Sequence, residues 1–330
     1  MGADVVRRIA DAVLYEGYLL WPYRKSALKN QQRFTFGGVY PPRWEDRSAI
    51  QAQVLFEGSE DAHVEVRVRF LHVVRRQVHA AGSPSGSLEP VERLEAGGLP
   101  LALEPVEELE AGGERWVTWD EAVEREIAPG PIGVAAGEQW EDIPGGVIRR
   151  SWLALEGEVT VARELVRPGL LRLTIRVANT TSWSGRDRQD ALRRTFCSTH
   201  IVLRTRDGAW VSLTDPPEAL RSEVDACENS GVWPVLVGED GDRGTMLAAP
   251  IILSDHPQIA PESPGDLFDS GEIDQMLVLN ILAMTEQERR EMRDSDPRAR
   301  EILERTEALT DEEILRLHGA VREFGLVRAR

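Results

Sequence analysis

The sequence predicts a mainly β protein of the α+β class, with an antiparallel β-sandwich-like core, an N-terminal helix and a helical C-terminal segment. Apolar and polar residues alternate over 63–70 and again over 171–177, which is the pattern of half-buried antiparallel strands. Because few helical patterns separate the many short strand-like runs, a sandwich or barrel is favoured over a doubly wound sheet. Further strands are predicted over 50–57, 114–119, 147–155, 158–166, 199–205, 209–213, 234–238 and 245–253.

Helices are predicted at both ends of the chain. The N-terminal one covers about 5–20 and ends before Pro22, because proline cannot continue a helix. In the C-terminal part, Thr285 with Glu288 has the spacing of a capping box, and Pro297 suits the first position of a helix. Three helices follow from these signals, over 272–293, 297–307 and 311–323, and the first of them is expected to break near Thr285.

The chain is divided by composition into three parts, 1–45, 46–253 and 254–330. The first holds the helix and an aromatic and basic segment, the second the β core, and the third a proline-rich loop and helices. Within the core, 82–113 contains two copies of an acidic repeat, Leu88–Gly98 and Leu103–Gly113. Two copies are too few for a solenoid, so we expect a loosely docked acidic insertion.

The charge of the chain disfavours nucleic acid and anionic membranes as partners, since 56 acidic residues face 39 basic ones and the net charge is −17. Arginines in the strand-like runs, at 67, 69, 75, 76, 149, 150, 193 and 194, are expected on solvated sheet faces. Two cysteines, no signal-peptide pattern and no long apolar run predict a cytoplasmic protein that is not inserted in a membrane.

Common catalytic signatures are missing from the sequence, so no catalytic residue and no cofactor are assigned. One alternative is a metal-dependent or acid–base hydrolase that uses Asp255, His256, Glu262 and Ser263, because a histidine beside a carboxylate can hold a proton near neutral pH. The other interpretation of the loop 255–269 is a rigid connector, whose acidic side chains accept hydrogen bonds from backbone donors.

A metal site is a second alternative, with Cys197, His200 and Cys227 as ligands and His256 as a further candidate. Residues 197 and 200 point to opposite faces of a regular strand, so both can bind one ion only if a β-bulge intervenes. The simpler interpretation makes the two cysteines small core residues and His200 a surface residue.

Aromatic and basic residues are interleaved near the N-terminus. Rings that alternate with arginine and lysine can stack nucleic acid bases, but the net charge opposes this. A protein-binding hot spot and a plug at one end of the sandwich core are the two remaining interpretations. The rings are Trp21, Tyr23, Phe34, Phe36, Tyr40 and Trp44, and the basic residues are Arg24, Lys25, Lys29 and Arg33.

Two long segments resemble an uncharacterised protein family associated with bacterial [NiFe]-hydrogenase gene clusters. One is 10–40, with Leu-Leu-Trp-Pro-Tyr-Arg-Lys-Ser-Ala-Leu-Lys-Asn, and the other is 250–284, with Pro-Gln-Ile-Ala-Pro-Glu-Ser-Pro-Gly-Asp-Leu-Phe-Asp. Ser212–Leu220 and Trp233–Gly238 fit the same resemblance. It implies a non-enzymatic, chaperone-like accessory protein that binds a hydrogenase subunit or a maturation factor, or else a stable structural subunit of a larger complex.

Under this hypothesis, two surfaces are expected to bind the partner, one in the N-terminal aromatic and basic segment and one in the proline-rich loop. Their residues are Trp21, Tyr23, Arg24, Asn30, Arg33, Pro261, Glu262, Phe268, Asp269 and Glu272.

Overall fold

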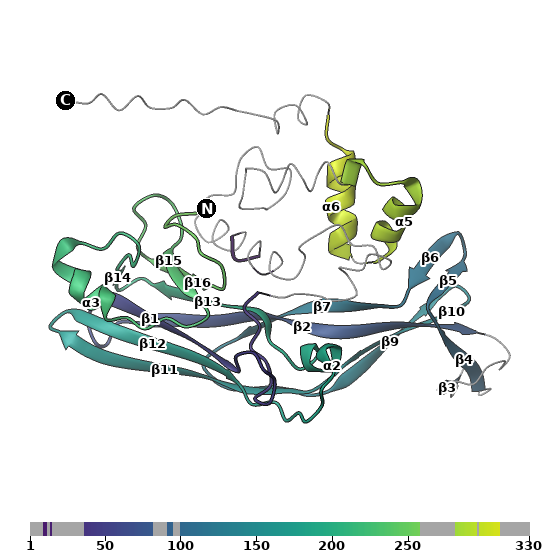
Figure 1. Cartoon of the computed structure of the whole chain (residues 1–330), viewed down its shortest axis with the longest axis horizontal. Coiled ribbons are helices and arrows are strands. Elements are labelled where there is room, and N and C mark those ends of the chain that lie inside the picture. Colours follow the sequence, from purple (N-terminus) through teal and green to yellow (C-terminus); the bar gives the residue numbers. More distant parts are fainter. Residues whose placement is uncertain are drawn as a thin grey trace. The chain divides into compact units, whose positions relative to one another are not determined.

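The computed structural model describes residues 9–11, 14, 36–81, 91–94, 100–257, 281–295 and 297–310. It divides the chain into two compact units. The larger comprises Met1–Leu20 and Lys25–Pro257, and the smaller Trp21–Arg24 and Gln258–Arg330. The predicted fold class is confirmed, because the larger unit consists mainly of antiparallel sheets (Figure 1).

One sheet of the larger unit has five strands, in the order β14-β1-β12-β11-β8. Strand β1 pairs with β12 in a register that places Ile50 opposite Val177 and Val54 opposite Leu173. Apolar residues of neighbouring strands therefore share the inner face of this sheet. The strands are β1 (Ala49–Gly58), β8 (Gly130–Val134), β11 (Leu155–Arg167), β12 (Leu170–Asn179) and β14 (Gly208–Trp210).

The other large sheet has nine strands, and its main path is β15-β16-β13-β2-β10-β9. Strands β4 and β7 also pair with β2, and β3 pairs with β4. Strands β5 (Glu108–Ala111) and β6 (Glu114–Val117) form a separate hairpin. The nine strands are β2 (Val64–Ala81), β3 (Val91–Leu94), β4 (Pro100–Val106), β7 (Trp119–Ile127), β9 (Gly137–Ile143), β10 (Gly146–Trp152), β13 (Cys197–Thr205), β15 (Trp233–Leu236) and β16 (Thr245–Ala249).

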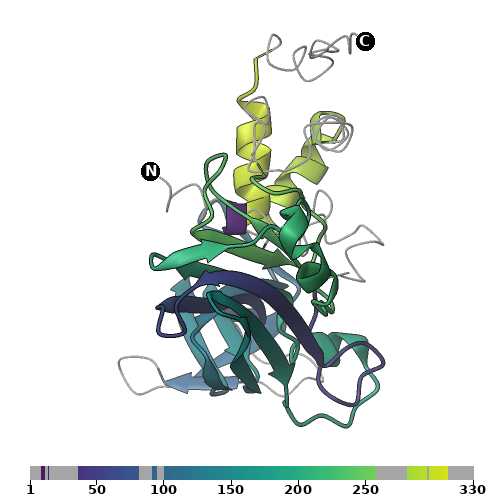
Figure 2. The same cartoon turned by 90° about the vertical axis from the view of Figure 1, so that its left-hand side faces the viewer.

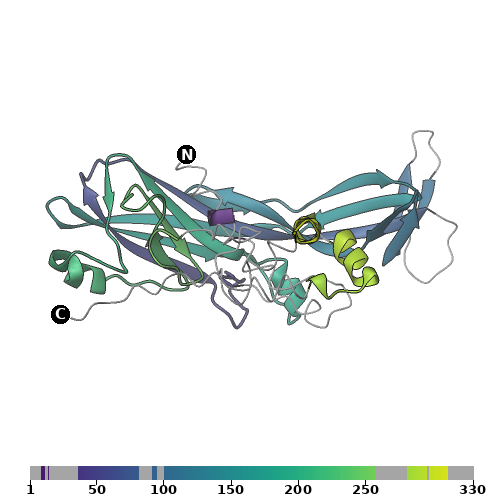
Figure 3. The ribbon, with the colours of Figure 1, turned by 90° about the horizontal axis from the view of Figure 1, so that it is seen from above.

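Strand β2 is much longer than the alternating pattern over 63–70 predicts. It continues through consecutive buried residues such as Val73 and Val74, which occur where both faces of a strand are covered. Its first part, Val64–Leu71, pairs with β13, and its last part pairs with β10. We call His72–Ala81 together with β4, β7, β9 and β10 the arm, and Figure 3 shows its teal and blue strands.

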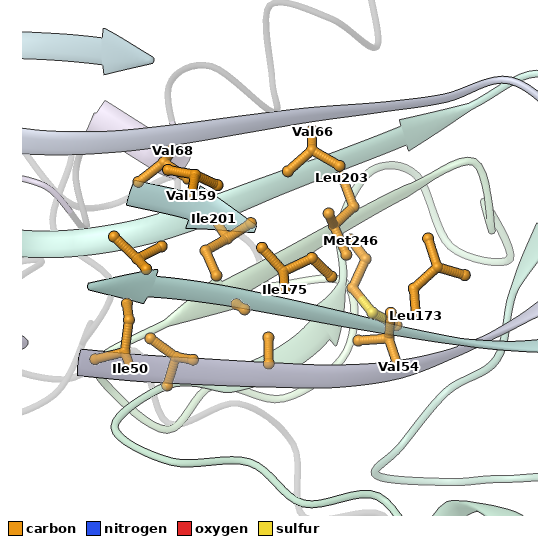
Figure 4. Packing of buried hydrophobic residues seen from close by; sticks show 14 of the residues in the cluster. Ile50, Val54, Val66, Val68, Val159, Leu173, Ile175, Ile201, Leu203 and Met246 are labelled. Atoms are coloured by element: carbon orange, nitrogen blue, oxygen red, sulfur yellow. The ribbon is translucent and has the colours of Figure 1, made fainter. Parts of the chain in front are cut away.

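The hydrophobic core lies between the two sheets, at the end of the unit that faces the viewer in Figure 2. Figure 4 shows Val54 and Leu173 of the five-stranded sheet together with Leu203 and Met246 of the nine-stranded sheet. All four side chains are fully buried. Burial of this apolar area is the main favourable term that stabilises the sandwich.

The predicted insertion over 82–113 differs from the structure in its described part, since β3 and β4 belong to the nine-stranded sheet and β5 pairs with β6. Helices α5 (Glu286–Ser295) and α6 (Pro297–Glu307) form in the smaller unit. The Thr285 capping box is present, because the Thr285 N–H donates to Glu288 Oε2 at 2.7 Å and the Glu288 N–H donates to Thr285 Oγ1 at 3.3 Å.

Among the helices that the structure describes, none has the length and apolar character needed to cross a membrane. The described part of the predicted N-terminal helix is residues 9–11 and 14, whose described side chains include the buried Ile9 and Leu14. The predicted helix over 311–323 lies outside the described residues.

Candidate functional site

Asp255 is held by hydrogen bonds from three separate positions of the larger unit. Its Oδ1 accepts from the backbone N–H of Leu236 at 2.7 Å, and its Oδ2 accepts from the hydroxyl of Thr214 at 2.7 Å and from that of Ser212. The backbone N–H of His256 donates to the carbonyl of Leu236 at 2.8 Å. We call these five residues the Asp255 clamp.

The clamp closes one edge of the nine-stranded sheet. Leu236 belongs to β15, which pairs with β16 on one side only among the described strands. The backbone N–H of Leu236 is bound by Asp255, and its backbone C=O is bound by His256. Pro234 of the same strand has no backbone N–H that another strand could bind. Asp255 thus binds a backbone donor, the role that the connector interpretation gives to this loop.

His256 has a backbone φ of +51°, in the left-handed region that non-glycine residues rarely adopt. Its Nδ1 is buried and makes no hydrogen bond. Asp255 and His256 are the two hydrolase candidates whose geometry can be followed, since Glu262 and Ser263 lie outside the described residues. The acid–base alternative therefore stays a prediction for this loop.

The three residues of the metal alternative lie in different surroundings. A β-bulge does intervene between Cys197 and His200, where the register with β2 shifts and Ser198 has a φ of +52°. Cys197 packs with Leu71 and neighbouring apolar residues, whereas Cys227 packs against a separate cluster around Leu55. Neither cysteine forms a disulfide, and no group of three His, Cys, Asp or Glu side chains in the described part of the chain is arranged to hold a metal ion.

His200 is not a surface residue, contrary to the expectation from its sequence surroundings. The side chain is fully buried, because both faces of β13 are covered and the bulge turns this position inward. Burial, together with the positive charge of Arg69, lowers its pKa to about 3. Its Nδ1 lies 3.3 Å from the carbonyl of Ser198, while Nε2 has no hydrogen-bond partner. His200 is therefore a neutral core histidine.

His72 of β2 is a second buried histidine, and the alternating pattern of the sequence does not single it out. Burial and the nearby Arg125 lower its pKa to about 4. The guanidinium Nη2 of Arg125 lies 3.5 Å from His72 Nδ1. At neutral pH the imidazole is uncharged, which removes the cost of burying a charge beside an arginine.

Two arginines predicted on solvated sheet faces are buried instead, so that expectation is wrong for Arg69 and Arg76. Arg76 donates to Glu121 at 3.1 Å and to the carbonyl of Val117 at 3.1 Å. Glu121 also accepts from Arg150 at 2.8 Å. A carboxylate shared between two guanidinium groups makes such burial tolerable, because each charge retains a partner.

The residues predicted to bind a partner lie in 21–33 and 261–272, outside the described residues. Of the aromatic segment, the exposed Phe36 is described, together with Tyr40 and Trp44. The rings of Tyr40 and Trp44 stack with centroids 6.1 Å apart, and Trp44 meets the edge of Trp183 at 5.5 Å. Tyr40 is buried, and burial raises its pKa to about 12. The interpretation of the rings as a plug of the sandwich core therefore applies to Tyr40 and Trp44.

Three exposed apolar residues belong to segments from distant parts of the sequence whose backbones meet near Pro250, and we call them the Pro250 corner: Phe36, Trp233 and Ile252. Their exposed fractions are 47%, 43% and 77%. Gly37, next to Phe36, approaches Pro250 so closely that an added Cβ would lie 2.3 Å from the proline Cβ. Trp233 is paired with Ala249 between β15 and β16, and Ile252 follows two residues after Pro250.

The Pro250 corner is unusual on this unit. Large apolar side chains are otherwise exposed, in the described part of the chain, at Val123 and Leu165. Val123 lies on β7 and Leu165 on β11, and these two strands do not pair with each other. The backbone segments that carry the corner residues, in contrast, all meet at 249–252. An exposed apolar group of this kind is typical of a protein-binding surface. A comparison of the chain with protein-family models and with curated proteins finds no match.

Proposed function

We propose that this protein works by binding another protein, as a non-enzymatic accessory or chaperone-like factor in the cytoplasm. The observation that carries the proposal is the Pro250 corner, where Phe36, Trp233 and Ile252 are exposed on an otherwise well-packed sandwich. Burying an exposed tryptophan and its apolar neighbours is a common source of binding energy between proteins. The resemblance of 10–40 and 250–284 makes a [NiFe]-hydrogenase subunit or maturation factor the partner.

The position of the corner in the chain supports this proposal. Phe36 follows three residues after Arg33, and Ile252 lies nine residues before Pro261. The two segments that the sequence predicts as partner-binding surfaces thus join the described structure at or near the corner.

The closed edge of β15 restricts how a partner can bind at the corner. Asp255 and His256 occupy the backbone groups of Leu236, and Pro234 lacks an N–H. A partner strand cannot extend the sheet there, because the groups that it needs are already engaged. We therefore expect side-chain packing onto Trp233 and Ile252 to supply the affinity.

Capture from the native host tests the proposal. The tagged wild-type protein should retain a hydrogenase subunit or maturation factor, and a Trp233→Ala/Ile252→Ser variant should retain at least about tenfold less, since truncating a hot-spot residue costs about 2 kcal/mol. Leu165→Ser is the matched control, because Leu165 is 49% exposed on β11 of the other sheet. Equal capture by both variants, or capture without any hydrogenase component, would contradict the proposal.

Size-exclusion chromatography of the captured material then separates a transient helper from a permanent subunit. An accessory factor should dissociate on dilution, whereas a structural subunit of a larger complex should stay with its partner. The proposal predicts dissociation.

A further inference from the structure

Strand β2 enters the arm through a stretch that has a neighbouring strand on one side only. Strand β7 pairs with β2 from Val68 to Arg76 without interruption (Figure 1). On the opposite side, the pairing with β13 ends at Leu71 and the pairing with β10 begins at Arg75. Among the described strands, none pairs with His72–Val74 on that side, and we call these three residues the joint.

Side-chain packing, rather than a second ladder, closes the joint. Neighbouring residues of a strand point to opposite faces. On one face, the buried Val73 belongs to the apolar cluster that contains Leu14. On the other face, His72 is fully buried, Val123 of β7 lies opposite it, and the backbone of Leu153 lies near its ring. The closed joint therefore encloses an imidazole.

The charged groups that face His72 in the described part of the chain come from β7, β2 and β10. Arg125 of β7 is the nearest, with its Nη2 3.5 Å from His72 Nδ1, and it forms no ion pair with a described carboxylate. Glu121 of the same strand is shared between Arg76 of β2 and Arg150 of β10. Among these groups, a cation lies beside the imidazole and no carboxylate is left to stabilise a proton on the ring.

A neutral imidazole is the form that suits the closed joint. Burial and the positive charge of Arg125 lower the pKa of His72 to about 4, whereas a histidine exposed to water has a pKa of about 6.5. Once the joint opens to water, the ring can take up a proton in the interval between these two values, and in the closed form it cannot. Lowering the pH through this interval therefore shifts the equilibrium toward the open form.

A second buried histidine of β2 shows why the position of His72 matters. His79 is also buried, but β10 pairs with it on one side and β4 on the other. Opening at His79 has to break two ladders, whereas opening at the joint breaks one. Local opening is favoured where fewer interactions must be broken, so the joint is easier to open than the strand around His79.

We propose that the joint is a pH-sensitive element of the fold, which opens ahead of the sandwich core when His72 takes up a proton. The missing ladder lowers the cost of local opening, and the buried ring beside Arg125 makes that cost depend on pH. Acid thereby loosens the attachment of the arm while β1 and β12 stay folded. The Pro250 corner plays no part in this inference, so either proposal can fail while the other stands.

Hydrogen exchange of the full-length protein at pH 7 and pH 5 tests the proposal. After correction for the intrinsic pH dependence of amide exchange, the opening constant of peptides that cover 72–76 and 119–124 should rise about 20-fold, as expected for one group whose pKa is about 4 when closed and about 6.5 when open. At pH 5, peptides of β1 and β12 should have opening constants at least about tenfold smaller than those of the joint. Equal opening constants in the two regions would show global unfolding and overturn the proposal.

Two matched variants assign the pH dependence to one residue. In His72→Gln the joint keeps a polar side chain that takes up no proton, so the rise in its opening constant should vanish. His79→Gln is the control and should keep the rise, because the strand around His79 stays closed. An unchanged rise in His72→Gln, or its loss in His79→Gln, would overturn the proposal.

An NMR titration of the wild-type protein decides the matter if His72→Gln does not fold. The ring of His72 should remain neutral in the folded protein at pH 5. A ring that titrates at about pH 6.5 in the folded protein would overturn the proposal, because proton uptake would then favour neither form of the joint.

Discussion

The backbone N–H of Leu236 donates to Asp255 Oδ1 at 2.7 Å, across 19 residues of the sequence. This bond joins the edge strand β15 to the residues just before Gln258, where the smaller unit resumes. The same carboxylate accepts from Ser212 and Thr214. One aspartate therefore fixes three segments of the sandwich close to the Pro250 corner.

Asp255→Ala should destabilise the protein by about 2–3 kcal/mol, because hydrogen bonds to a carboxylate are stronger than neutral ones and their donors would lose their acceptor. Urea unfolding measures this free energy, and hydrogen exchange should show faster exchange at Leu236. Asp215→Ala is the control, since the side chain of Asp215 is exposed and the clamp uses only its neighbours. If both variants are equally stable, Asp255 does not hold the edge of β15.

Glu121→Gln should cost about 3 kcal/mol of unfolding free energy. It removes the charge that Arg76 and Arg150 share, and Arg76 is buried, so its guanidinium would lose an ionised partner inside the arm. Glu164→Gln gives the comparison, because Glu164 binds Arg172 from a side chain that is 67% exposed. We expect almost no change in the unfolding free energy of Glu164→Gln. A similar loss of stability in both variants would show that burial of the ion pair does not determine the loss.

Stability should fall as the pH falls from about 6.5 toward 4, in part because of His72 and His200. In the folded protein their pKa values are lowered to about 4 and about 3, mainly by burial. Unfolded histidines take up protons near pH 6.5, so the unfolded state binds more protons across this window, and each histidine contributes up to about 1.4 kcal/mol per pH unit. Above pH 7 neither contributes a slope.

His72→Leu checks this account, because it removes one of the two titrating groups. The unfolding free energy of the variant, measured from pH 7 to pH 4.5, should fall less steeply than that of the wild type. The difference in slope should correspond to about one proton fewer taken up on unfolding. A wild-type slope in His72→Leu would mean that the imidazole is already protonated in the folded protein.

Alternation over 63–70 and 171–177 predicts β2 and β12 correctly because one face of each strand packs on the core and the other, apart from the buried Arg69, is less buried. It does not predict the rest of β2, where Val73 and Val74 are both buried, or the strand β9, whose acidic sequence lacks apolar alternation. Apolar and polar residues alternate along a strand only when its two faces have different environments. The alternation therefore does not predict a strand whose two faces are both covered or both exposed.

The candidate sites depend on contacts that sequence spacing cannot supply. Asp255 stands out in the sequence as part of an acidic loop, but its partners Ser212 and Thr214 lie more than 40 residues away. The segments that carry Phe36, Trp233 and Ile252 are brought together by the pairing of β15 with β16 and the contact of Gly37 with Pro250.

The most direct test of the account is the affinity of the purified protein for purified hydrogenase subunits and maturation factors, measured by titration calorimetry. We predict that at least one of them binds the wild type, and that Trp233→Ala/Ile252→Ser weakens this binding at least about tenfold while unfolding free energy stays the same. Undiminished affinity of that double variant would contradict the claim that the Pro250 corner is where the protein meets its partner.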